Sequence, residues 1–259
     1  MRALHLRTRS TAIALVAALA TPAASQDVGG VMDMTGMGIY AMEETVMQAA
    51  RESAARPRSR ARAAPTPAGR LTYRPSMERR RANFAMFVAK SRKKDPVGAA
   101  MLERELATSD VMGKMTRELA GFGMHVDNVA DAYAIWWLNA WLASRQRADT
   151  PPMAQISAVR AQAAQAIASA PGFATASDAA KQEMAEANLL QAMLIGAYIE
   201  RAKNDRDLSR RLADAVRQGA RASGLNLDAM DLTDEGFVPR RTGVIDGPAA
   251  ERSIAAPSG

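Results

Sequence analysis

The stretch DAAKQEMAEANLLQAMLIGAYIE, residues 178–200, decides the fold class of this chain. Its apolar residues recur at steps of three or four, which is the spacing that gathers side chains on one face of an α-helix. These residues are Ala180, Met184, Ala187, Leu190, Leu194 and Ala197. The spacing predicts an amphipathic helix of about seven turns, and Thr175 with Asp178 places a threonine-to-acid start signal in front of it.

Helix start and stop signals continue on both sides of this stretch, while the alternation typical of strands is nearly absent. Start signals are side chains that cap a first turn, or a proline at its beginning; stop signals are glycine and proline. The starts are Ser76, Asp95-Pro96, Ser109, Asn128 and Thr150-Pro151, and the stops are Gly121, Pro171-Gly172 and Gly224. The pattern predicts an all-α domain over residues 76–232, a single bundle or array of six to eight helices.

Composition divides the rest of the chain into four further zones. Residues 1–25 are expected to be a signal peptide, and residues 26–54 a methionine-rich segment with a short amphipathic helix. Residues 55–75 are expected to be a basic linker rich in Pro, Ala and Arg, because four prolines prevent a helix there. Residues 233–259 carry scattered Gly and Pro, and we expect a disordered tail.

The first 25 residues have the layout of a secretory signal. Arg2, Arg7 and Arg9 precede an apolar run over residues 11–20, and small residues then end at Ser25. The run is shorter than the roughly 20 residues of a membrane-spanning helix. We therefore expect cleavage after Ser25, a periplasmic or secreted product, and no transmembrane span after cleavage.

Cysteine is absent, and the two histidines are His5 and His125. This composition excludes disulfide frameworks, zinc fingers and thiol nucleophiles, along with metal sites that need several Cys or His ligands. We expect no cofactor and assign no metal site.

Charge is concentrated in one block of the 259-residue chain. Residues 51–94 hold fourteen Lys or Arg and two acids, whereas residues 27–50 hold four acids and no base. Such a block attracts anionic partners, and for an exported chain these are anionic lipid, lipopolysaccharide or an acidic protein face rather than nucleic acid. The candidate contacts are Arg56, Arg58, Arg60 and Arg62; a merely solvated linker is the alternative.

The methionine-rich segment supplies the other candidate contacts. From residue 39 to residue 50 the apolar side chains of Met42, Val46 and Met47 suit a short amphipathic helix. A helix of this length is marginal alone in water, and it gains order by docking on its own domain, a second copy or another protein. Disorder and Cu(I) binding by the thioethers are the alternatives left open.

All three tryptophans lie within six residues, close to a tyrosine: Tyr133, Trp136, Trp137 and Trp141. We expect an inward stripe of this helix to form the central packing unit, since the chain has only 5% aromatic residues. A groove for a glycan or an apolar peptide, lined by the edge of Trp136 or Trp137, is the alternative.

Several acidic residues are candidate catalysts. Asp127 and Asp131 flank a helix start near His125 and are interpreted as capping groups rather than an acid–base pair. Glu183 and Glu186 are expected on a solvated helix face. Residues 231–242 begin like a calcium loop but lack its final Glu, so we expect a turn from helix to tail.

Three segments carry a resemblance. They are residues 128–137 (NVADAYAIWW), residues 176–186 (ASDAAKQEMAE), and the closing pair 224–228 (GLNLD) and 236–239 (GFVP). They resemble a family of secreted proteobacterial proteins catalogued as a domain of unknown function. The resemblance covers roughly residues 71–239, leaves the methionine-rich segment and the linker outside, and implies a secreted helical domain without assigning any residue a role.

These observations predict a non-enzymatic interaction or structural protein of the envelope or the exterior. Its N-terminal arm is expected to dock an envelope protein or a second copy. The alternative is a carboxylate-based hydrolase of an envelope polymer, since glycosidases need only acidic residues and aromatic platforms.

Overall fold

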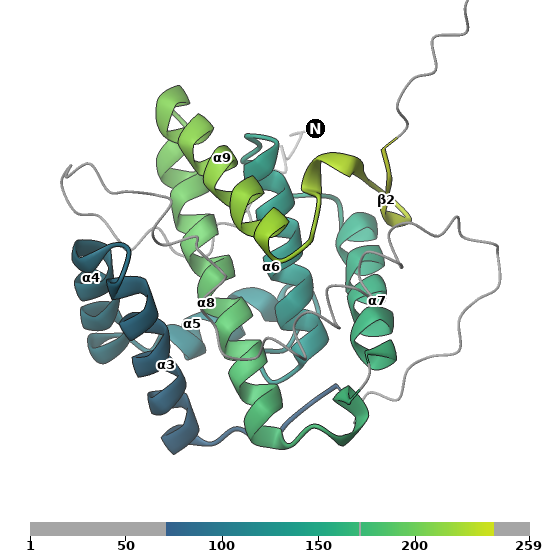
Figure 1. The fold of residues 1–259 in the computed structure, drawn as a ribbon. Helices are drawn as coiled ribbons and strands as arrows, with labels where there is room; N and C mark the ends of the chain where they lie inside the picture. The colour runs from purple at the N-terminus through teal and green to yellow at the C-terminus, as the bar shows by residue number, and fades with distance from the viewer. Residues whose placement is uncertain (1–70, 171, 241–259) are drawn as a thin grey trace, which may run out of the picture.

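A computed structural model describes residues 71–170 and 172–240 of the chain, and Figure 1 shows their arrangement. This part contains seven α-helices: α3 (Met77–Arg92), α4 (Pro96–Thr108), α5 (Val111–Ala120), α6 (Val129–Ser144), α7 (Met153–Ser169), α8 (Asp178–Ala202) and α9 (Arg206–Ala222). Two short strands, β1 (Met230–Thr233) and β2 (Gly236–Pro239), follow and pair antiparallel. The predicted all-α class is confirmed. The predicted signal, the methionine-rich segment and residues 55–70 lie outside the described residues.

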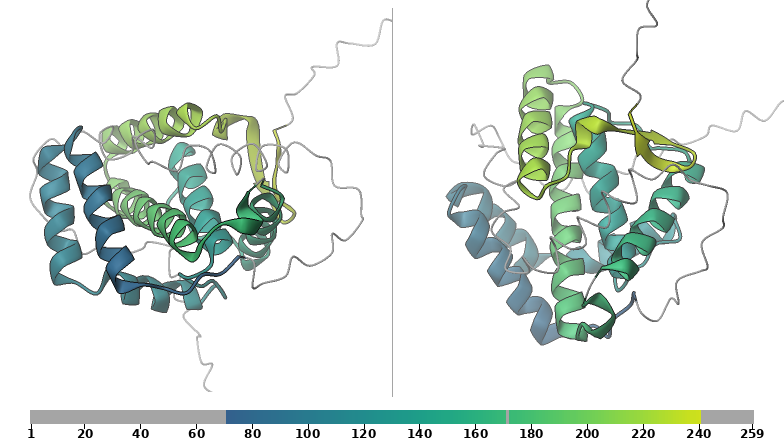
Figure 2. Two further views of the ribbon diagram at one scale, coloured as in Figure 1. Left: turned by 60° about the horizontal axis from the view of Figure 1, so that its bottom comes forward. Right: turned by 45° about the vertical axis from the view of Figure 1, so that its right-hand side comes forward.

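Helix α6 is the centre of the domain. All of its sixteen residues are buried, because α7, α8 and α9 pack around it (Figures 1 and 2). The sequence predicted only an inward stripe on this helix, and that prediction was too narrow: the helix has no solvent face. A helix that is apolar all round is typical of the core of a larger domain.

Most helix starts lie at the predicted capping residues. The side chains of Ser76, Asp95 and Asn128 accept hydrogen bonds from backbone N–H groups in the first turns of α3, α4 and α6. Two caps differ from the prediction by one or two residues, since Asp110 replaces Ser109 and Ser177 replaces Thr175. In both cases a neighbouring short polar side chain makes the same type of bond.

The N-terminal boundary of the domain was predicted too late. Leu71 and Tyr73, which were assigned to the linker, are buried in the core. The N–H of Val129 donates to the carbonyl of Leu71 at 2.9 Å, and the N–H of Tyr73 donates to the carbonyl of Asp127 at 3.1 Å. Residues 71–75 therefore form an edge against the start of α6, because these backbone pairs and two buried side chains outweigh the local Pro and Arg content.

The C-terminal boundary was also predicted too early. Residues 233–239 belong to the β1–β2 hairpin and are not a disordered tail, and Gly236, with φ of 95°, ends the hairpin turn. Phe237 stacks on Trp137 with ring centroids 4.4 Å apart. Gln162 of α7 closes the free edge of β2: its Nε2 donates to the carbonyl of Phe237, and its Oε1 accepts from the N–H of Phe237, both at 2.7 Å.

Candidate functional site

One fully buried acid of this domain is Glu186, at the contact between α3 and α8. Its side chain is fully buried and accepts three hydrogen bonds, from Arg80 Nε at 2.8 Å, Asn83 Nδ2 at 2.7 Å and Gln182 Nε2 at 2.9 Å. Gln182 also joins the backbone of Ser76, whose N–H donates to Gln182 Oε1 and whose carbonyl accepts from Gln182 Nε2. We call these five residues the Glu186 cluster. The expectation of a solvated face was wrong for Glu186, because α3 covers it.

The charge of Glu186 affects the pKa of a neighbouring tyrosine, Tyr73. Burial raises the pKa of the Tyr73 hydroxyl, and the negative charge of Glu186 raises that pKa further. The hydroxyl donates to the carbonyl of Val126 at 3.0 Å, so the neutral phenol is the form that fits this site. The carboxylate of Glu186 is itself engaged by donors from Arg80, Asn83 and Gln182.

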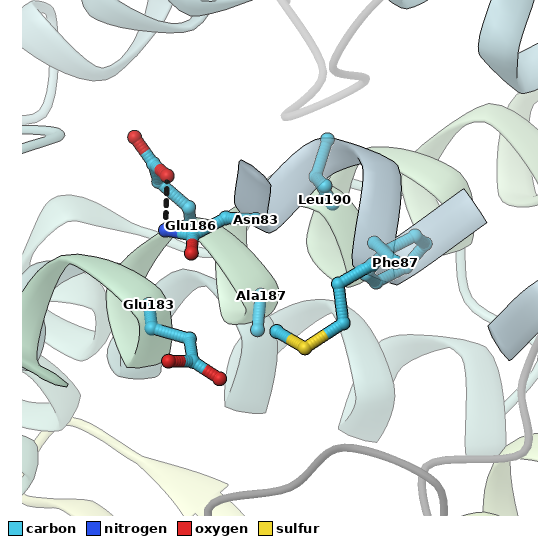
Figure 3. Close-up of a pocket in the computed structure, with 7 residues that line it drawn as sticks. Asn83, Phe87, Glu183, Glu186, Ala187 and Leu190 are labelled. Carbon is cyan, nitrogen blue, oxygen red and sulfur yellow. Dashed lines mark hydrogen bonds between the residues drawn. The ribbon is translucent and has the colours of Figure 1, made fainter. Parts of the chain in front are cut away.

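A small hollow lies beside the Glu186 cluster and is shown in Figure 3. Asn83, Phe87, Glu183 and Leu190 are among its lining residues. Its volume of about 10 Å³ is enough for about one water molecule. In Figure 3 the carboxylates of Glu183 and Glu186 point in different directions. This hollow therefore cannot hold a sugar ring between two acids, which is the arrangement a glycosidase requires.

A larger pocket lies at the other end of the domain. There the C-terminal ends of α6 and α8 meet the start of α9, near the top of Figure 1. We call it the α6–α9 pocket; its volume is about 220 Å³. It is lined by Ala143, Gln146, Arg147, Ala148, Ile199, Ala202, Lys203, Arg206, Ser209 and Leu212. The lining combines aliphatic side chains with three cations and includes no carboxylate.

The three cations of this pocket differ in whether they pair with a carboxylate. Arg147 donates to Asp149 at 2.8 Å and 2.5 Å, and these bonds lower the pKa of the Asp149 carboxyl. Lys203 is paired with Glu200 at 2.5 Å. The side chain of Arg206 makes no hydrogen bond or ion pair within residues 71–170 and 172–240. Arg206 is therefore the cation of the rim that forms no ion pair with a carboxylate of the described residues.

Gln146 lines the same pocket in a conformation that side chains rarely adopt. Its φ is 54°, and among the described residues it alone has a positive φ without being glycine. The N–H of Arg147 donates to the carbonyl of Leu142 at 2.9 Å, so α6 ends in a motif that normally places glycine at this position. A residue with a side chain here costs about 1–3 kcal/mol. Strain of this kind at a pocket is typical of functional positions.

The predicted ligand groove on the tryptophan helix is not observed. Tyr133, Trp136, Trp137 and Trp141 are all buried, with exposed fractions of 3%, 1%, 0% and 5%. Trp141 also donates from Nε1 to the carbonyl of Met230 at 3.0 Å, which ties it to the hairpin. Burial favours the packing interpretation, since neither Trp136 nor Trp137 presents an edge at the surface.

The acids near His125 take structural positions. The carboxylate of Asp131 accepts from the N–H of His125 at 2.9 Å and pairs with Arg160 at 2.5 Å and 3.0 Å. Asn128 caps α6 by accepting from the N–H of Ala130 and of Asp131. This geometry favours a structural role for Asp131 over an acid–base pair. The capping side chain is Asn128, however, and Asp131 instead binds the loop before α6 and pairs with Arg160 of α7, which the sequence did not predict.

The remaining candidate contacts lie outside the described residues: Met42, Val46, Met47, Arg56, Arg58, Arg60 and Arg62. The residues that sequence reasoning missed are Glu186, Gln146 and Arg206. Glu186 resembles any exposed helix acid, and its partners Arg80 and Asn83 are 106 and 103 residues away. Gln146 carries no signal, because the sequence rule for its position expects glycine.

The fold and these sites define a helical domain with a closed aromatic core and, among the described residues, an open pocket with a basic rim. The chain belongs to a family of unknown function (DUF6683), whose model matches residues 6–240. The match extends further than the resemblance seen in the sequence, because it also includes the methionine-rich segment and the linker. Comparison with curated proteins and with solved structures finds no match.

Proposed function

We propose that this protein is an exported, non-enzymatic interaction protein whose α6–α9 pocket receives a segment of polypeptide. The observation that carries the proposal is the lining of that pocket: an aliphatic floor under a rim of Arg147, Lys203 and Arg206. Apolar anchors surrounded by polar and charged groups are the usual composition of a site that binds a peptide or protein.

Size favours a polypeptide over a small substrate. Small-molecule sites usually occupy about 300–1,000 Å³, whereas this pocket has about 220 Å³. It can hold a few side chains of a longer segment whose backbone stays on the surface. The strained Gln146 at the rim supports the choice of this pocket, since a glycine there would remove the strain and also the side chain.

The hydrolase alternative gains no such support. The carboxylates of Glu183 and Glu186 do not face each other, and the hollow beside them holds about one water molecule. Asp131 is held by Arg160 and by the N–H of His125.

None of the helices in residues 71–170 and 172–240 combines the length and apolar character needed to cross a membrane.

The proposal keeps the N-terminal arm as the docking element and the envelope or exterior as the location. An envelope protein or a second copy is the proposed partner. The arginines from Arg56 to Arg62 are proposed to speed association with an anionic face of protein, lipid or lipopolysaccharide, because rim charges act mainly on association rates.

A photo-reactive residue placed in the pocket tests this function. Ser209 lines the pocket, so a benzophenone side chain at that position should form an adduct with polypeptide when producing cells are illuminated. The same side chain at Ala85, on the exposed face of α3, is the matched control and should form none. Mass spectrometry that finds no polypeptide adduct specific to position 209, within the chain or beyond it, would contradict the proposal.

A further inference from the structure

We propose that residues 39–50 of the same chain occupy the α6–α9 pocket, with Met42 and Val46 on its aliphatic floor and Glu43 and Glu44 at its rim. This inference rests on the proposed function, to which it adds the identity of the occupant. Three independent observations support it: charge, shape and reach.

The charges of the two parts are complementary. Residues 27–50 carry four acids and no Lys or Arg, and two of the acids, Glu43 and Glu44, lie within the docking segment. Asp149 and Glu200 already pair with Arg147 and Lys203, so Arg206 offers the unbalanced charge. An acidic segment therefore pairs with Arg206 first, and a basic segment would be repelled.

The apolar parts also match. Ile199, Ala202 and Leu212 line the pocket from α8 and α9. On a helix over residues 39–50, Met42 and Val46 lie one turn apart on one face, which is the spacing that lays an amphipathic helix into a groove. Methionine adapts to irregular apolar surfaces, because its side chain is unbranched and flexible.

The chain between the two parts is long enough. Leu71 is bonded to Val129 at the start of α6, and the pocket begins at Ala143, fourteen residues further along that helix. Fourteen residues of α-helix span about 21 Å. Residues 51–70 can extend over about 60 Å, and three prolines, Pro57, Pro65 and Pro67, favour an extended linker. The linker is thus long enough for the segment to reach the pocket of its own chain.

Tethering favours the chain's own segment over a second copy. A segment joined by a short linker meets its site at an effective concentration in the millimolar range. The family model matches the segment and the helical domain together, within residues 6–240. An arm that serves its own domain is consistent with a family pattern that includes both.

The test uses the purified mature chain with a benzophenone side chain at position 42. After illumination, peptide mapping should place the adduct in residues 143–148 or 199–212 of the same molecule, and the yield should not change with protein concentration. The same side chain at Gln48, on the other face of the predicted helix, should give at least several-fold less of this adduct. An adduct between two molecules, an adduct elsewhere on the domain, or none would overturn the inference.

A charge swap separates specific docking from chance contact. Arg206→Glu should lower the yield several-fold, and adding Glu43→Arg with Glu44→Arg should restore it. Arg79→Glu, on α3, is the matched charge change outside the pocket and should have no effect. An adduct yield that is the same in the Arg206→Glu variant and in the parent would overturn the inference. If position 209 binds another protein while position 42 does not reach the pocket, the proposed function stands and this inference fails.

Discussion

Glu186 and Gln146 each occupy an environment that is unusual for the residue type. Glutamate is rarely buried, and glutamine rarely adopts a positive φ. Glu186 is a fully buried carboxylate that is stable because Arg80, Asn83 and Gln182 all donate to it. Gln146 accepts a backbone angle that glycine would adopt without strain. The first is explained by its contacts within the domain, and the second lines the α6–α9 pocket.

Glu186→Ala should lower the free energy of unfolding by about 3 kcal/mol, because the variant leaves three buried donors without their acceptor. Urea unfolding followed by circular dichroism measures the change. Glu183→Ala, three residues earlier on α8, is the matched control and should stay within about 0.5 kcal/mol of the parent. Equal effects from the two variants would mean that the Glu186 cluster does not stabilise the domain.

Gln146→Gly should have opposite effects on stability and on docking. Relief of the left-handed conformation should leave the free energy of unfolding unchanged or raise it, by up to about 1 kcal/mol. Loss of the side chain should reduce the position-42 adduct in the pocket. A variant that is markedly less stable would show that the Gln146 side chain has a structural role instead.

Residues 71–75 and the β1–β2 hairpin, at the two ends of the domain, depend on long-range contacts that cannot be predicted from their own sequences. Residues 71–75 lie along the start of α6, and the β1–β2 hairpin lies on Trp137 and Trp141. By contrast, the caps at Ser76, Asp95 and Asn128 were predictable, because each joins residues no more than three apart. Local rules located helix starts to within two residues, but contacts across 50 or more residues set the domain boundaries.

Deletion of residues 26–70 should leave the domain folded, and it should lower the melting temperature only by the contribution of the docked segment. Deletion of residues 26–75 also removes Leu71 and Tyr73 from the core, and it should lower the free energy of unfolding by several kcal/mol, since each large core side chain contributes about 2–5 kcal/mol. Thermal unfolding of the two deletion variants side by side measures the difference. Identical unfolding curves for the two variants would show that residues 71–75 belong to the linker and do not stabilise the domain.

Truncation at the other end offers a similar comparison. Removal of residues 241–259 should not affect stability, whereas removal of residues 230–259 takes Phe237 off Trp137 and leaves Trp141 Nε1 without its acceptor. The longer truncation should destabilise the domain and shift its tryptophan emission to longer wavelength. Emission at the parent wavelength would show that the hairpin does not cover the tryptophans.

At the scale of the whole molecule, the class was predictable and the pocket was not. Hydrophobic periodicity and caps are local, and they sufficed to predict an all-α domain of six to eight helices, of which the described residues contain seven. The α6–α9 pocket arises where three helices meet, so its residues are scattered from Ala143 to Leu212 and follow no motif. Gln146 also carries no sequence signal, because the helix-end rule looks for glycine at a left-handed position.

Export is the prediction that belongs to the whole chain. The product in the envelope or the medium should begin at Gln26, because the small residues before it fit the signal peptidase. N-terminal peptide mapping by mass spectrometry measures this. An intact Met1 on protein retained in the membrane fraction would show that the segment is an anchor.

The burial of α6 on every side has a consequence for the chain before it folds. A helix with a polar face can form in water before its partner helices have folded. Helix α6 (VADAYAIWWLNAWLAS) is buried on every side, so it is shielded from water only after α7, α8 and α9 have packed around it. In a chain that is still unfolded, these sixteen residues form an exposed apolar segment of the kind that holdase chaperones bind and that promotes aggregation. Helices α7, α8 and α9 are all made after α6, so the nascent chain carries this exposed segment for at least the next 78 residues of synthesis.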